Sequence, residues 1–161
     1  MLVSYNELPP TSKVWIYQAD RALSVEEIGL LNEQLEAFVD DWKAHQHPVK
    51  GFGSIFYKRF LVLIADESFN DVSGCSIDST VHFIKELEMT FNVNFFDRLK
   101  IAYKLTEQSV GAVSKKQLLE MLDKGMLSPE TIVFNNLVQT KADFEANWEI
   151  PLKESWVFAK V

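Results

Sequence analysis

The chain is poor in cysteine, glycine and proline. Its 161 residues include one Cys, six Gly and five Pro. A single cysteine cannot form a disulfide within the chain, which is typical of proteins from a reducing compartment. The remaining composition, 47% hydrophobic and 24% charged, is that of an ordinary folded protein. We therefore expect one domain, residues 1–161, with a sizeable core.

Basic charge is also scarce. Sixteen Lys and Arg face 23 Asp and Glu, which gives a net charge of −7. The basic residues do not cluster, since the tightest groups are the pairs Lys58-Arg59 and Lys115-Lys116. An acidic surface repels phosphate backbones and anionic lipids. Nucleic acid is therefore not an expected partner.

Long apolar runs are missing as well. The longest, "FLVLIA" at 60–65, is about a third of the length of a membrane span. The first residues, "MLVSYNELPP", have no positive charge before Lys13 and no long apolar core, unlike a secretory signal. We expect a cytoplasmic protein without membrane association. Aromatic residues, in contrast, are abundant at 12%. They predict a dense core, an adhesive patch for a partner, or both.

Propensity and periodicity predict an alternation of strands and helices after an irregular lead-in, residues 1–12. Ser24 and Glu27 form a capping box before the strongest amphipathic helix, whose apolar positions run from Val25 to Trp42. Ser114 and Gln117 form a second box. The expected strands are 13–19, 53–57, 60–65, 98–105, 131–134 and 155–161, and the other expected helices run from about 77 to 91, 115 to 124 and 140 to 148.

The segment 51–67 leaves two alternatives open. It is long for one strand, and Lys58-Arg59 interrupts it, which favours a hairpin of 53–57 and 60–65. Neither turn residue is Gly or Asn, so one bent strand is the alternative.

The order strand, helix, strand, strand, helix, strand over residues 13–105 is the ferredoxin-like βαββαβ order, with two helices on one face of a four-stranded sheet. Residues 106–161 form an α/β extension to this core. The predicted fold class is therefore α+β.

Through four short segments, the chain resembles a family of uncharacterised bacterial proteins of about this length. The segments are "VWIYQADR", "GCSID", "TIVFNNLVQTK" and "NWEIPLKESW". Members are often labelled "ABC transporter ATPase", and the resemblance brings no established activity. ATPases of that class carry the phosphate loop GxxxxGK[ST]. The nearest fragments here, "GFGSI" and "GAVSKK", lack the second glycine and the ordered Lys-Ser/Thr. We expect no ATPase activity.

One edge of the predicted sheet collects polar side chains. With the first and third strands taken as parallel neighbours, their carboxyl ends meet beside both helix N-termini. Carboxylates there bind Mg²⁺ or serve as a general base, but they also form local ion pairs and stabilise helix starts. The structural role is favoured, so neither metal nor cofactor is predicted. The candidate ligand-binding residues are Gln18, Asp20, Arg21, Asp66, Glu67, Ser73, Gly74, Ser76 and Asp78.

Cys75 is the candidate catalytic residue. A thiol before a helix lies in the positive end of the helix dipole, which favours the thiolate, but the nearest base in sequence is His82. In the alternative interpretation Gly74 permits a turn, Ser76 or Asp78 caps the helix, and Cys75 packs as a small apolar residue. Packing is the favoured interpretation.

The remaining candidates have weaker signals. His45 and His47 lack the i, i+4 spacing of a zinc pair. Asn136 and its neighbour are typical of a turn but also suit a ligand. Trp148 and Trp156 fit core packing better than a partner groove.

Two functions follow from these features. The first is a non-catalytic binding or regulatory module that acts through a protein partner or as a homo-oligomer. The second is a small enzyme with its site at the 18–21, 66–67 and 73–79 edge and with Cys75 as nucleophile or redox thiol.

Overall fold

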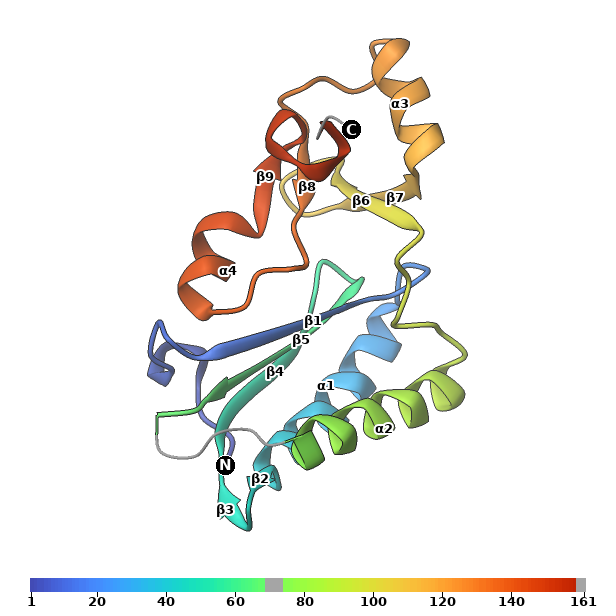
Figure 1. The fold of residues 1–161 in the computed structure, drawn as a ribbon. Coiled ribbons are helices and arrows are strands. Elements are labelled where there is room, and N and C mark those ends of the chain that lie inside the picture. Colours follow the sequence, from blue (N-terminus) through green and yellow to red (C-terminus); the bar gives the residue numbers. More distant parts are fainter. Residues whose placement is uncertain (69–73, 159–161) are drawn as a thin grey trace.

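A computed structural model describes residues 1–68 and 74–158, of which residues 74–76 are described by their backbone only. The chain is mixed α+β, as predicted, with two main sheets (Figure 1). The first sheet has the strand order β1 (Lys13–Gln18), β5 (Phe60–Asp66), β4 (Lys50–Phe56). The second has the order β7 (Val110–Ser114), β6 (Lys100–Lys104), β8 (Ile132–Phe134), β9 (Glu149–Pro151).

In the described part of the chain, four α-helices accompany these sheets: α1 (Val25–Asp40), α2 (Gly74–Phe91), α3 (Lys115–Asp123) and α4 (Lys141–Asn147). Both α1 and α2 lie along the first sheet on the face away from the second sheet (Figure 1). A small hairpin, β2 (Lys43–Ala44) with β3 (His47–Pro48), follows α1. Residues 1–68 and 74–158 also contain three short 3-10 helices: Tyr5–Glu7, Leu152–Glu154 and Trp156–Phe158.

Local capping chemistry begins the helices where the sequence predicts. Ser24 and Glu27 form the capping box of α1, and Ser114 and Gln117 form that of α3. Each box satisfies backbone N–H groups that a helix start leaves without partners. These helix starts are confirmed.

The segment 50–66 forms a hairpin, so the alternative of one bent strand is wrong. Its turn places Tyr57 and Lys58 at φ values of 52° and 58°. Side chains rarely adopt this region, because Cβ crowds the backbone there. Contacts of the turn with the rest of the chain compensate: Leu23 N donates to Lys58 O and Ala19 N to Arg59 O, each at 2.8 Å.

β5 lies antiparallel to both of its neighbours, so β1 and β4 are parallel to each other with β5 between them. The prediction that the first and third strands run parallel is therefore wrong. The reason is the hairpin. After α1, β4 runs in the same direction as β1, and β5, the second strand of the hairpin, runs opposite to both. The order β1-β5-β4, with α1 between the parallel strands β1 and β4, is a split βαβ arrangement.

The predicted strand 98–105 exists as β6, but it belongs to the second sheet. This part of the ferredoxin-like prediction is wrong. The outer edge of β1, where the fourth strand would pair, is used by two other segments. Val14 N donates to Gln139 O at 3.0 Å, and at the far end Asp97 N donates to Gln18 O at 3.3 Å. β6 therefore pairs with β7 and β8, which groups it with the segment 106–158.

The core is continuous through β5. Its residues Leu61, Leu63 and Ala65 pack with α1 and α2, and the alternate residues pack with the second sheet and α4. Every residue of β5 from 60 to 65 is buried. A strand covered on both faces explains the unbroken run "FLVLIA". The predicted strand at 155–161 is wrong over its described residues, because Ser155 Oγ accepts from Val157 N and holds a 3-10 turn.

Candidate functional site

The structure divides the predicted edge site into two distant halves. Gln18 pairs with Phe60 in the β1–β5 register, whereas Lys13 pairs with Ala65. The end of β1 therefore lies beside the beginning of β5, not beside Asp66. Five strand residues correspond to about 17 Å. The carboxylates after β5 do not meet the polar residues after β1.

The half after β1 is a network of satisfied polar groups. Gln18 is buried; its Nε2 donates to Lys100 O at 2.9 Å, and its Oε1 accepts from Asn136 Nδ2 at 3.0 Å. Asn136 Oδ1 in turn accepts from Trp148 Nε1 at 2.9 Å. This chain of hydrogen bonds connects the first sheet to the second. Gln18, Asn136 and the buried Trp148 thus serve to join the two sheets.

Asp20 and Arg21 also have structural partners. Asp20 Oδ1 accepts from Asn94 N at 3.0 Å. Arg21 makes a two-pronged ion pair with Glu27, at 2.9 and 2.8 Å, and donates to Phe91 O at 2.8 Å. The guanidinium therefore joins the start of α1 to the end of α2. The hydrogen bonds from Arg21 and from Ser24 N lower the pKa of Glu27 to about 2.

The half after β5 lies at the other end of the sheet. Asp66 Oδ1 accepts from Ser68 N at 2.9 Å, a local turn, and Glu67 follows it directly. α2 begins at Gly74, earlier than the predicted start between residues 76 and 79. Asp78 is therefore an exposed residue inside the helix and not its cap.

Ser73 lies outside the described residues, and so do the side chains of Gly74, Cys75 and Ser76. The histidines His45 and His47 lie in the β2–β3 hairpin rather than on α1. Within residues 1–68 and 77–158, no group of three or more His, Cys, Asp or Glu side chains is arranged to hold a metal ion.

A groove between α1 and α2 forms a surface concavity near this end of the sheet. Its volume is about 580 Å³, and it continues along α2 into a second hollow that shares Gln34 and Phe83. Lining side chains come from both helices and from the start of β2. They are Gln34, Ala37, Phe38, Asp41, Trp42, Lys43, Ser79 and Phe83, with Glu86, Leu87, Met89 and Thr90 in the continuation.

Aromatic rings form the floor of the groove. Phe38 and Phe83 stack with ring centroids 4.3 Å apart, and the ring of Trp42 lies 5.8 Å from that of Phe38. Trp15 of β1 lies 5.8 Å behind Trp42. The two phenylalanines remain half-buried. An aromatic surface that is partly open to water, with polar groups around it, is typical of a binding site.

Trp42 carries the most unusual polar group of the groove. Its side chain is 4% exposed, and its Nε1 has no hydrogen-bond partner among the described residues. The Cε3 edge of the indole lies against Gly51 of β4, so the Nε1 edge is on the side away from the sheet. A buried donor without a partner is costly, about 1–3 kcal/mol.

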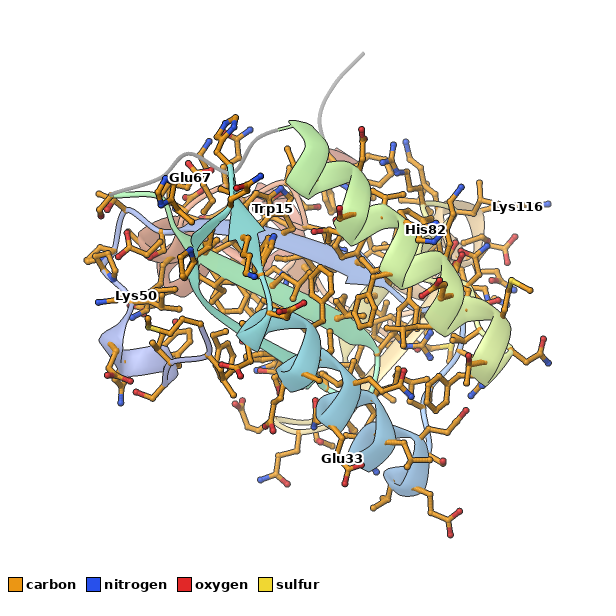
Figure 2. The ribbon with its side chains drawn as sticks, turned by 90° about the horizontal axis from the view of Figure 1, so that it is seen from below. Trp15, Glu33, Lys50, Glu67, His82 and Lys116 are labelled. Atoms are coloured by element: carbon orange, nitrogen blue, oxygen red, sulfur yellow. The ribbon has the colours of Figure 1, made fainter. Side chains whose placement is uncertain are left out.

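The exposed flank of α1 is acidic. Every charged residue of α1 is Glu or Asp, and Asp41 follows at its end. Glu26, Glu33 and Asp40 recur at seven-residue spacing, so they share one exposed flank of the helix. Figure 2 shows Glu33 on the side of α1 away from α2, and His82 on α2.

Sequence reasoning missed this groove, although its signals were present. Phe38 and Trp42 fit the apolar period of α1 and were expected in the core. Periodicity identifies the apolar face of a helix, but it does not distinguish a buried ring from one at the rim. The acidic composition of α1 was visible, but it did not indicate which side of the helix faces the groove.

A second polar cluster anchors the strained hairpin turn. Tyr57 Oη donates to Glu149 Oε2 at 2.8 Å, and Lys104 Nζ forms an ion pair with Glu149 and lies 5.2 Å from the Tyr57 ring centroid. Burial and the Glu149 hydrogen bond raise the pKa of Tyr57. Burial alone would lower the pKa of Lys104, but the hydrogen bonds to Glu149 and Tyr57 outweigh it and raise that pKa. Both side chains therefore keep their protons at neutral pH, which suits anchoring rather than proton transfer.

Comparison with protein-family models, with curated proteins and with solved structures gives no match. No helix within the described part of the chain is long and apolar enough to cross a membrane.

Proposed function

We propose that the protein is a non-catalytic binding module that takes a segment of a partner protein into the groove between α1 and α2. The observation that carries the proposal is the half-buried Phe38–Phe83 stack at the floor of the groove. An aromatic floor supplies binding free energy by burial.

Exposed apolar side chains extend the same surface. Met89 lines the continuation of the groove and is 86% exposed, and Leu30, one turn before Gln34 in α1, is 53% exposed. Large apolar residues along an open groove favour a polypeptide over a small enclosed ligand. The single cysteine and the acidic composition support the cytoplasm as the compartment, and ATP hydrolysis is no part of the proposal.

Site-specific photo-crosslinking in the native cells tests the proposal. A photoreactive phenylalanine analogue replaces Gln34 in the groove or, as a control, Lys124 at the end of α3, which is exposed. We expect one adduct from Gln34, with its crosslinked peptide identified by mass spectrometry, and none from Lys124. Met89→Glu should abolish the adduct without unfolding the protein, whereas Met126→Glu, at another exposed methionine, should not.

Two results would overturn the proposal. The first is no adduct from Gln34. The second is an adduct of Gln34 with another copy of the chain, which would assign the groove to self-association.

A further inference from the structure

We infer that the protein forms a dimer in which the β7 strands of two copies pair antiparallel and join their second sheets edge to edge. This inference is independent of the proposed function, because β7 lies in the second sheet and the groove lies on the far face of the first (Figure 1). It follows from the open backbone of β7, from the protection of the other sheet edges, and from the charges at the two ends of the strand.

The outer edge of β7 presents backbone groups without partners. Leu105 N donates to Ser109 O at 2.9 Å, so these two residues form a hydrogen-bonded pair where the β6–β7 ladder ends. Such pairs alternate with non-bonded pairs along an antiparallel ladder, so Gly111, two residues further on, also faces β6. The N–H and C=O groups of Val110 and Ala112 therefore point away from the sheet, where they have no hydrogen-bond partner among the described residues. A row of such groups is a template for another strand.

The other edges of the two sheets are protected. On the outer edge of β4, Gly51 N donates to Met1 O and Ile55 N donates to Asn32 Oδ1, each at 3.0 Å. Two other segments cover the outer edge of β1, as described above. β9 has three residues and ends at Pro151. β7 has none of these devices, since its sequence "VGAVS" contains neither charge nor proline, and an edge of this kind favours pairing.

Charges at the two ends of β7 make this edge complementary to itself. Lys115 and Lys116 follow the strand directly, and Figure 2 shows Lys116 pointing away from the body of the molecule. Glu107 precedes the strand; its side chain is 95% exposed and forms only a long ion pair of 3.7 Å with Lys104. Antiparallel pairing places the two lysines of each copy beside Glu107 of the other, whereas parallel pairing brings the basic pairs together. Opposite charges across paired strands are stabilising, so the occupant of the edge is a second copy in the antiparallel orientation.

A two-fold axis at Gly111 satisfies the open backbone groups. Val110 of each copy then lies opposite Ala112 of the other, and these two residues exchange hydrogen bonds. Ser114 N is not needed for the pairing, because it already donates to Gln117 Oε1 at 3.0 Å. Gly111 has no side chain to crowd the close approach of the two strands at the axis.

Sedimentation of the full chain over a series of concentrations tests the inference. We expect a monomer–dimer equilibrium. Ala112→Pro removes the outward N–H of the edge and leaves the bonds of β7 to β6 in place, so it should weaken the dimer about tenfold or more.

Charge reversal tests the orientation without a change to the backbone. Lys115→Glu with Lys116→Glu, or Glu107→Lys alone, brings like charges together and should weaken the dimer about threefold or more. The variant with all three changes has opposite charges again and should recover the affinity of the parent. The control is Lys124→Glu, an exposed change at the far end of α3, which should leave the affinity unchanged.

Amide hydrogen exchange locates the contact. The amides of Val110 and Ala112 should exchange rapidly in the monomer and slowly at concentrations where the dimer forms. The Gly111 amide, which faces β6, should be protected in both states.

A monomer at every concentration would overturn the inference. So would a dimer whose affinity is unchanged by Ala112→Pro and by the charge reversals, or one in which Val110 and Ala112 exchange as rapidly as in the monomer. None of these results bears on the adduct from Gln34, which tests the groove separately.

Discussion

The rings of Phe38 on α1 and Phe83 on α2 lie parallel, with an interplanar angle of 5° and centroids 4.3 Å apart. This stack joins the two helices at the floor of the groove. It means that the binding surface is also part of the packing that holds α2 on the sheet. Changes at the floor are therefore expected to alter both stability and binding, and changes at the rim only binding.

A double-mutant cycle measures the interaction free energy between the two stacked rings. Phe38→Leu and Phe83→Leu keep an apolar side chain at each position but remove the ring contact. We expect a coupling of about 0.5–1.5 kcal/mol in the free energy of unfolding, the range for an aromatic pair beyond its burial. Chemical denaturation of the parent, both single variants and the double variant gives the value. Additive single effects would mean that the rings do not stack in solution.

Removal of the α1 cap should destabilise the fold. Ser24 Oγ accepts from Glu27 N at 3.1 Å, and Glu27 Oε1 accepts from Ser24 N at 3.0 Å. Ser24→Ala removes the first of these bonds, and we expect a loss of about 1 kcal/mol in the free energy of unfolding. The matched comparison is Ser4→Ala, at the start of the 3-10 helix Tyr5–Glu7 in the exposed lead-in. This change should lower the free energy of unfolding by less. An unchanged midpoint for Ser24→Ala would contradict the capping role.

Local chemistry of this kind was predictable from the sequence. Both capping boxes and the hairpin depend on residues close in the chain. The position of β6 was not predictable, because it depends on the edge of β1 being used by Gln139, more than a hundred residues away. The same limit explains the failed edge site. Whether Asp66 lies near Gln18 depends on strand direction, and an antiparallel register places them at opposite ends.

The groove was predictable only in part. The apolar period of α1 identified Phe38 and Trp42 as inward-facing, and the composition showed an excess of aromatic residues. That the rings of α1 meet Phe83 of α2 depends on the packing of elements about forty residues apart. The same holds for the indole N–H of Trp42, which has no partner in the part of the chain that the structure describes. Helical periodicity contains no information on such contacts.

The ion pair of Arg21 and Glu27 predicts a pH dependence of stability. The pKa of Glu27 is about 2 in the folded chain, below the value of about 4.3 in an unfolded chain. A lowered folded-state pKa stabilises the fold above the unfolded pKa, and this contribution is lost as the pH falls from about 4.3 to about 2. Glu27→Gln should therefore destabilise the protein at pH 7 and approach the parent near pH 2. The measurement is the unfolding midpoint of both proteins across this range; a constant difference would exclude the linkage.

The last prediction concerns the cluster of Tyr57, Lys104 and Glu149, which anchors the strained turn. Variants of these residues should lower the free energy of unfolding by different amounts, in a definite order. Tyr57→Phe keeps the ring packed against Phe134 and Trp148 and removes only the hydrogen bond to Glu149, so we expect a loss of about 1 kcal/mol.

Glu149→Ala removes that bond and also the closer ion-pair partner of Lys104, whose side chain is only 13% exposed. The longer pair with the exposed Glu107, 3.7 Å from Nζ, remains. A largely buried ammonium group left with only this longer pair should cost more, about 2 kcal/mol. Adding Lys104→Met to Glu149→Ala should restore part of the loss, because the stranded charge is gone while the apolar stem remains. Denaturant unfolding of the three variants tests the order. If Lys104→Met further destabilised Glu149→Ala, the remaining pair of Lys104 with Glu107 would be stabilising by itself, and Glu149 would not be the main anchor of the turn.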